Sequence, residues 1–163
     1  MQKEDKPLKL DRTDRRILDL LQKDGGLSNQ ELAEHVGLSP SPCSRRVRAL
    51  EEAGIILRRV TLLERKKLGL SLTVIIQIGM DRHTPERFAE FESQVASFAE
   101  VQECYLVTGQ EADYMLKVVV PDMDAYQHFL LDKVTRIPGV SGVHSSFVLR
   151  RVVDNTELPL GYL

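Results

Sequence analysis

The chain has 163 residues, of which 42% are hydrophobic and 28% charged, so it is long enough for one ordinary domain or two small ones with a sizeable core. No apolar run approaches the length of about 18 residues that a membrane-spanning helix needs, which excludes a transmembrane protein. The N-terminal lysines are not followed by an apolar segment, so we expect no signal peptide and a cytoplasmic location.

The formal net charge of −2 hides a division along the chain. Residues 1–67 hold 15 Lys and Arg against 11 Asp and Glu, a balance of +4, whereas residues 68–163 hold 7 against 13, a balance of −6. A basic N-terminal unit joined to an acidic C-terminal one suggests that the first binds a polyanion. A solvated charge bias without function is the alternative.

Helical signals follow an N-terminal arm, which we place at residues 1–10 because this stretch shows no apolar period. Asp11 and Asp14 have the spacing of a capping box, and apolar residues at helical spacing run from there to Gly25. The pattern predicts a first helix of about three turns.

Two further helices are predicted downstream. Ser28 begins a second capping box, and the short helix after it ends at Gly37. Ser39 as N-cap and Pro40 at the first helical position begin the third helix, which Gly54 ends. Three helices with a tight glycine-containing turn between the second and third indicate a helix-turn-helix arrangement.

The third helix has two chemically distinct faces. Cys43, Val47 and Leu50 form the stripe that packs on the other helices. Hydroxyls followed by arginines suit entry into the major groove of DNA, although a surface helix with arginines kept for solubility has the same pattern. The residues of this opposite face are Ser41, Ser44, Arg45, Arg48 and Glu52.

The C-terminal part alternates between strand and helix patterns. We expect strands near residues 56–63 and 72–80, with a linker at residues 64–70 between the two domains. Residues 71–163 then give the order strand, helix, strand, strand, helix, strand, with a turn at Gly109. This order predicts a ferredoxin-like βαββαβ fold, an antiparallel sheet with two helices on one face, so the chain as a whole is α+β.

The first strand of that sheet has apolar residues on both faces. Val74, Ile76 and Ile78 alternate with Ile75 and Gln77. One face takes the helices, and the other needs a partner to be removed from water. We therefore expect self-association.

The chain resembles the Lrp/AsnC (feast/famine) transcriptional regulators over residues 8 to about 160, in the segments LDRTDRRILDLLQKDGGLSNQELAEHVGLSPSPCSRRVRALEEAGII, ECYLVTGQEADYMLKVVVPDMDAYQHFL and PGVSGVHSSFVL. The run LSPSPCSRRVRALE is the most specific of these. The resemblance implies a winged helix-turn-helix domain over residues 11–63 that binds double-stranded DNA at the nucleoid. It also implies a C-terminal domain that dimerises, senses an amino acid and assembles further, commonly into an octamer of four dimers.

The resemblance also implies site residues. Those on the groove side of the recognition helix are Ser39, Ser41, Ser44, Arg45 and Arg48, while Arg46 either pairs with a phosphate or braces the domain. The effector pocket of such proteins lies between dimers. The corresponding positions here are Leu106, Thr108, Gly109, Asp113, Tyr114 and Met123, with Ser145 and Ser146 from a partner.

A turn suits this effector chemistry because backbone N–H groups can receive an α-carboxylate while Asp113 receives an α-ammonium. Asp113 could instead serve only to shape the turn. The usual turn of the family has two residues between its Gly and its Asp, whereas this chain has three, Gln110, Glu111 and Ala112. The identity of the ligand is therefore open.

An enzyme and an architectural DNA-organising protein without ligand are the competing functions. Cys43 and Cys104 lie 61 positions apart without a zinc-type spacing, so we expect ordinary buried thiols. The four histidines have no spacing that indicates a metal site or a catalytic triad: they are His35, His83, His128 and His144. We expect no catalysis, no metal and no cofactor other than the small-molecule effector.

Overall fold

The computed structural model describes residues 9–109 and 112–163, which form two compact units. The helical unit contains residues 9–62 together with residues 153–163, and the sheet unit contains residues 63–152. We expected residues 153–163 to belong to the second domain. They lie with the first because hydrogen bonds connect them to its first helix.

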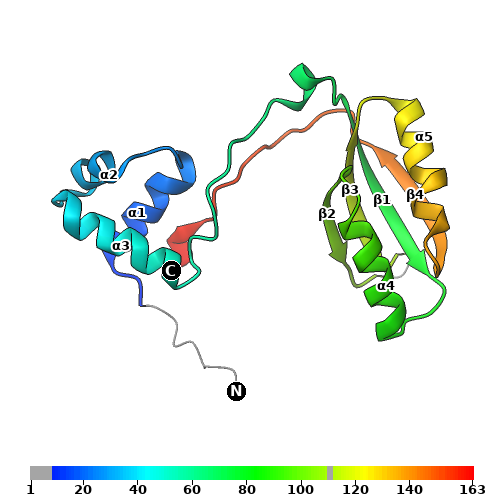
Figure 1. Ribbon diagram of the computed structural model, residues 1–163, viewed down its shortest axis with the longest axis horizontal. Helices are drawn as coiled ribbons and strands as arrows, with labels where there is room; N and C mark the ends of the chain where they lie inside the picture. Colours follow the sequence, from blue (N-terminus) through cyan, green and yellow to red (C-terminus); the bar gives the residue numbers. More distant parts are fainter. Residues whose placement is uncertain (1–8, 110–111) are drawn as a thin grey trace. The chain divides into compact units, whose positions relative to one another are not determined.

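The helical unit consists of α1 (Arg12–Lys23), α2 (Asn29–Val36) and α3 (Pro40–Glu52), as predicted (Figure 1). Capping boxes begin α1 and α2, and Gly37 ends α2 in the left-handed conformation with φ of 69°. The apolar stripe of α3 packs against the other two helices. The buried core of the unit is Ile17, Leu32, Ala33, Cys43, Val47 and Leu50.

The strand expected near residues 56–63 is not formed. Residues 57–64 have no regular secondary structure and lead into a 3-10 helix, η1 (Arg65–Leu68). Apolar side chains along this segment are exposed, Leu57 by 87% and Leu62 by 71%. A strand needs a hydrogen-bonded neighbour, and no strand of the described chain pairs with this segment. Apolar composition alone therefore misled the prediction.

The sheet unit has the predicted βαββαβ order, with α4 and α5 on one face of an antiparallel sheet (Figure 1). The order of strands across the sheet is β2-β3-β1-β4, so β2 and β4 are its edges. A 3-10 helix, η2 (Val134–Arg136), precedes the last strand. The elements are β1 (Leu72–Met80), α4 (Pro85–Ala96), β2 (Val101–Leu106), β3 (Tyr114–Val120), α5 (Met123–Asp132) and β4 (Val140–Phe147).

Alternation along β1 places the core of the sheet unit on one face, as predicted. Val74, Ile76 and Ile78 are fully buried beneath the helices, while Ile75 is half-buried and Gln77 exposed on the other face. Cys104 is an exception to the expectation of buried thiols: it is exposed, because β2 is an edge strand.

A C-terminal strap, residues 153–163, completes the helical unit. The side-chain amide of Gln22 on α1 donates to the carbonyl of Leu158 at 3.1 Å and accepts the Leu158 N–H at 2.9 Å. Lys23 Nζ lies 4.0 Å from Glu157 Oε2. The strap ends in a 3-10 turn, η3 (Leu160–Tyr162), drawn in red in Figure 1. The helical unit is therefore built from two segments that lie on either side of the sheet unit in the sequence.

An ion-pair cluster joins the beginning of α1 to α3. Arg46 Nη1 lies 2.7 Å from both Asp11 Oδ2 and Asp14 Oδ1. The two carboxylates also accept each other's backbone N–H, which caps α1. The hydrogen bond from the Asp14 N–H, and then that from Arg46, hold the pKa of Asp11 below its ordinary value. One guanidinium thus fixes α3 against a helix N-terminus.

We predict that Gln22→Ala loosens the strap, because both hydrogen bonds to Leu158 are lost. At about 0.5–1.5 kcal/mol for a net hydrogen bond, the free energy of unfolding of the helical unit should fall by about 1 kcal/mol. Hydrogen exchange of the α1 amides measures the change. Gln30→Ala, an exposed glutamine on α2, is the control and should leave exchange unaltered.

We predict that Arg46→Met lowers the free energy of unfolding of the helical unit by about 1–2 kcal/mol, because Asp14 keeps only 9% exposure and loses its counter-charge. The Asp11 carboxylate, whose pKa the Asp14 N–H and Arg46 hold below its ordinary value, stabilises the fold fully above about pH 4 and loses that effect as the pH falls through its folded pKa. The difference between parent and variant should therefore shrink in acid.

Urea unfolding of parent and variant at pH 7 and pH 3, followed through the α1–α3 amides, measures this difference. Arg48→Met is the matched control on the same helix. It removes an exposed pair with Glu52 and should change stability by less than about 0.5 kcal/mol. An Arg46 variant as stable as the parent at pH 7 would exclude a structural contribution from the cluster.

Candidate nucleic-acid interface and ligand-binding turn

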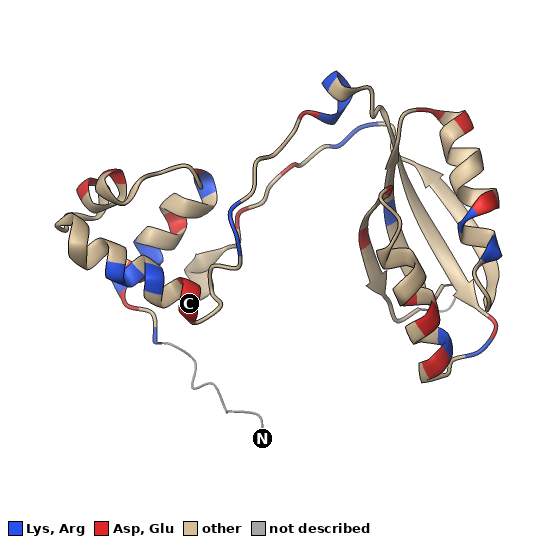
Figure 2. Cartoon of the chain, in the orientation of Figure 1, with Lys and Arg blue, Asp and Glu red and all other residues tan. Residues whose placement is uncertain are grey.

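The face of α3 away from the core carries the predicted hydroxyls and arginines. Ser39 is the N-cap, and its side chain makes no capping hydrogen bond. Arg45 is exposed, and Arg48 Nε lies 2.8 Å from Glu52 Oε1 in a pair of which both side chains are mostly exposed. Figure 2 shows basic residues along α3, in contrast to the acidic residues of α2. The face offers hydroxyls and cations to a polyanion.

Besides Arg48, two of the predicted DNA-binding residues have partners within the unit. Ser44 Oγ accepts a long hydrogen bond from Asn29 Nδ2 at 3.4 Å. Arg46 points toward Asp11 and Asp14 rather than along the face of Arg45 and Arg48. Of the two alternatives for Arg46, its contacts favour the brace.

A hollow of about 400 Å³ lies beside this face, between α3 and the start of the described chain. Lys9, Arg45 and Arg46 bring three cationic groups to its rim. Phosphates are bound by lysine and arginine in this manner. The hollow extends the basic surface from α3 toward the N-terminal arm.

The described residues on either side of the turn between β2 and β3 are hydrogen-bonded at one end of the sheet. Leu106 ends β2 and is exposed, and Thr108 and Gly109 follow it. Gln110 and Glu111 of the lengthened turn lie outside the described residues. Past them, the Asp113 N–H donates to the Ile78 carbonyl, and the Asp113 carbonyl accepts the Val107 N–H, each at 2.8 Å. The backbone of Asp113 is thus fixed by both flanking segments.

Both carboxylate oxygens of Asp113 have partners in this chain. Oδ2 accepts the Met80 N–H at 2.7 Å, and Oδ1 lies 2.7 Å from His83 Nε2. The Asp113 side chain keeps 22% exposure, against 67% for His83. Sequence reasoning missed both partners, because nothing local connects residue 113 to the end of β1. These contacts support a shaping role for Asp113 besides any role in binding.

Tyr114 is a core residue whose hydroxyl makes a partly buried hydrogen bond. It is 1% exposed, its ring packs on Phe88 and Phe91, and its hydroxyl donates to Glu92 Oε1 at 2.7 Å. Burial, and then the hydrogen bond to Glu92, raise the pKa of Tyr114. With Leu106 it lines a hollow of about 350 Å³ between α4 and β2.

The remaining predicted effector residues lie elsewhere in the sheet unit. Met123 begins α5 at the far end of β3 from Asp113, and the seven residues of β3 span about 20 Å. Ser145 faces the helices, where its hydroxyl bonds that of Tyr126, whereas Ser146 is exposed. Both serines are on β4, the edge opposite β2. A single chain therefore does not bring the eight residues together.

The described residues form neither a metal-binding cluster nor a membrane-spanning helix. Within residues 9–109 and 112–163, no three His, Cys, Asp or Glu side chains gather as a metal site requires. None of the helices in these ranges is long and apolar enough to cross a membrane.

Known proteins match both units. Residues 10–56 match the family described as winged helix-turn-helix DNA-binding, and residues 73–158 match the Lrp/AsnC ligand binding domain. The leucine-responsive regulatory protein of Klebsiella pneumoniae is 46% identical over 149 residues, covering 91% of this chain and 90% of the relative. The protein of the same name from Escherichia coli strain K12 is 45% identical over 149 residues, with the same coverage.

Solved structures agree. A transcriptional regulator from Neisseria meningitidis in complex with L-methionine matches with a TM-score of 0.90 and 40% identity, covering 94% of this chain and 99% of its own. An AsnC family regulator from Agrobacterium tumefaciens matches with a TM-score of 0.89 and 42% identity, with the same coverage. The chain therefore belongs to the Lrp/AsnC family of transcriptional regulators.

Proposed function

We propose that the helical unit binds double-stranded DNA by inserting α3 into the major groove. Ser39, Ser41 and Ser44 reach phosphates or base edges, and Arg45 and Arg48 read bases or bind phosphates. The exposure of Arg45 and Arg48 on one face of α3 carries this proposal. The two matched domains are those of a DNA-binding regulator and not of an enzyme.

The sheet unit, we further propose, binds an amino acid at the turn of Gly109 and Asp113. The name of the Klebsiella relative refers to leucine, and the Neisseria structure contains L-methionine, so apolar amino acids are the first ligands to test. Backbone N–H groups of the turn receive the α-carboxylate, and Asp113 receives the ammonium. An architectural protein without ligand is the alternative.

The exposed face and the edges of the sheet also support self-assembly of the chain. The face of the sheet away from the helices leaves apolar side chains half-buried, among them Ile75, Met115 and Val119. A second copy of the chain would cover them, which supports a homodimer. The proposed effector residues are divided between the two edges of the sheet, so a neighbouring subunit must supply Ser145 and Ser146. We propose an octamer of four dimers, acting in the cytoplasm at the nucleoid.

Arg48→Ala should weaken DNA binding without a measurable change in melting temperature. Removing one phosphate contact lowers the log-log salt slope by about 0.9, and removing a base contact costs about 1–3 kcal/mol. Fluorescence anisotropy on an operator fragment at several salt concentrations measures both. The matched control is Arg136→Ala at the end of η2, which also removes an exposed i,i+4 pair. Equal affinity of parent and Arg48 variant for DNA would contradict the assignment of α3.

Asp113→Asn should weaken binding of L-methionine or L-leucine by about fivefold to 150-fold, because an ammonium loses its carboxylate at a cost of about 1–3 kcal/mol. Asparagine keeps an oxygen for the Met80 N–H, so the turn retains its shape. Calorimetric titration measures the change. Asp132→Asn, on the exposed end of α5, is the control. Absence of heat with every common amino acid added to the parent would favour the architectural protein instead.

A further inference from the structure

We propose that His83 is a built-in competitor of the effector: its imidazole takes the place of the ligand's ammonium at Asp113 Oδ1 while the site is empty. The inference rests on the proposed amino-acid site and concerns its regulation. It is carried by the 2.7 Å contact between His83 Nε2 and Asp113 Oδ1. His83 is thereby a specificity-determining residue that does not itself contact the ligand.

The two oxygens of Asp113 differ in how easily their partners leave. Oδ2 accepts the backbone N–H of Met80, the last residue of β1, and that donor moves only if the strand does. Oδ1 is held by a side chain of the loop between β1 and α4 that is 67% exposed. An exposed side chain exchanges rotamers in picoseconds to nanoseconds. Oδ1 is therefore the position at which a ligand can replace a protein group.

An aromatic contact also fixes the position of the His83 side chain. Its ring centroid lies 6.0 Å from that of Phe88, and Phe88 in turn packs edge-on against Tyr114, the neighbour of Asp113. This aromatic row keeps the imidazole beside the carboxylate. Imidazolium and ammonium are both cationic N–H donors, and two cations on one carboxylate oxygen lie close enough to repel each other. A charged imidazole at Oδ1 therefore opposes binding of the ligand's ammonium there, and ligand binding favours a rotamer in which His83 has moved away.

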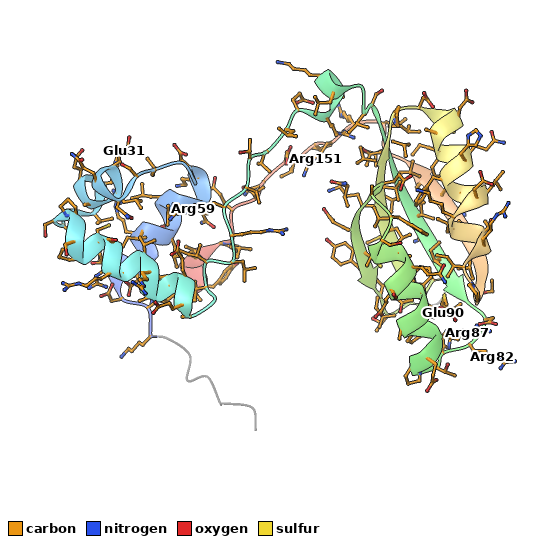
Figure 3. The ribbon with its side chains drawn as sticks, viewed as in Figure 1. Glu31, Arg59, Arg82, Arg87, Glu90 and Arg151 are labelled. Carbon is orange, nitrogen blue, oxygen red and sulfur yellow. The ribbon has the colours of Figure 1, made fainter. Side chains whose placement is uncertain are left out.

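Three of the charged groups on the elements around His83 are paired with one another. Arg87 on α4 lies 3.4 Å from Asp81 and 3.5 Å from Glu90, and Figure 3 shows Arg87 and Glu90 beside each other, with Arg82 at the same end of the sheet unit. The carboxylate that the imidazole contacts is that of Asp113. The titratable and charged groups on these elements are Asp113 on the chain leading into β3, Glu86, Arg87, Glu90 and Glu92 on α4, and Asp81 and Arg82 on the loop itself.

The competition gives the effector site a dependence on pH. Histidine side chains gain their proton as the pH falls from 8 to 5, and an imidazolium binds a carboxylate more strongly than a neutral ring does. Amino-acid ammonium groups stay charged throughout that range. Affinity for an amino acid should therefore fall as the pH is lowered, and the fall should depend on His83.

The test is calorimetric titration of L-methionine and L-leucine into the full-length protein and into His83→Ala, at pH 6.0 and pH 7.5. Removing an exposed competitor should tighten binding by about two- to fivefold at pH 6.0 and by less at pH 7.5. His83→Gln, which keeps a neutral donor, should fall between the parent and His83→Ala. His128→Ala, an exposed histidine on α5, is the matched control and should match the parent.

A ligand without the ammonium separates competition from a general loosening of the turn. The 2-hydroxy acid that corresponds to methionine should bind the parent and His83→Ala about equally, because its neutral hydroxyl is not repelled by a charged imidazole at Asp113 Oδ1. Equal or weaker methionine binding by His83→Ala at pH 6.0 overturns the inference and leaves the amino-acid site intact. Binding of no amino acid to parent or variant overturns the site itself, whereas DNA affinity, measured on the same samples, reports separately on the helical unit.

Discussion

Burial of one face of β1 determines which surfaces of the sheet unit another molecule can reach. Val74, Ile76 and Ile78 lie completely beneath α4 and α5, and β1 is hydrogen-bonded on both sides, to β3 and to β4. The strand that carries the core is therefore central and inaccessible. What remains open to another molecule is the opposite face and the two edge strands, β2 and β4. Every proposed effector residue outside the core is on an edge, a turn or a helix N-terminus, where the packing leaves room for a second subunit.

Three neighbouring arginines of α3 show how helical geometry separates stability from recognition. Successive residues are rotated by about 100°, so Arg46 points toward α1 while Arg45 and Arg48 point outward. The partners of Arg46, Asp11 and Asp14, also cap α1, so the same two carboxylates begin one helix and hold another. The side chains available to DNA are thus mounted on a helix whose position does not depend on them.

Much of the fold could be predicted because its signals are local. The capping boxes at Asp11 and Ser28 and the alternation along β1 each depend on residues that are only a few positions apart. The structure confirms all three. The strap and the His83–Asp113 pair could not be predicted, because they join residues 136 and 30 positions apart through side chains of ordinary composition. The strand expected near residues 56–63 failed for the opposite reason: its composition was suitable, but strand formation depends on a partner that the described chain does not supply.

The strap gives the chain the topology of a domain insertion. Residues 63–152 are contiguous and begin and end at neighbouring strands, where Val74 pairs with Phe147. The helical unit is interrupted by them and is completed only by residues 153–163. During synthesis on the ribosome, α1 is made well before Leu158, the residue that its Gln22 binds. The DNA-binding half of a nascent regulator therefore reaches its final form only after the residues of the ligand-binding half have been made.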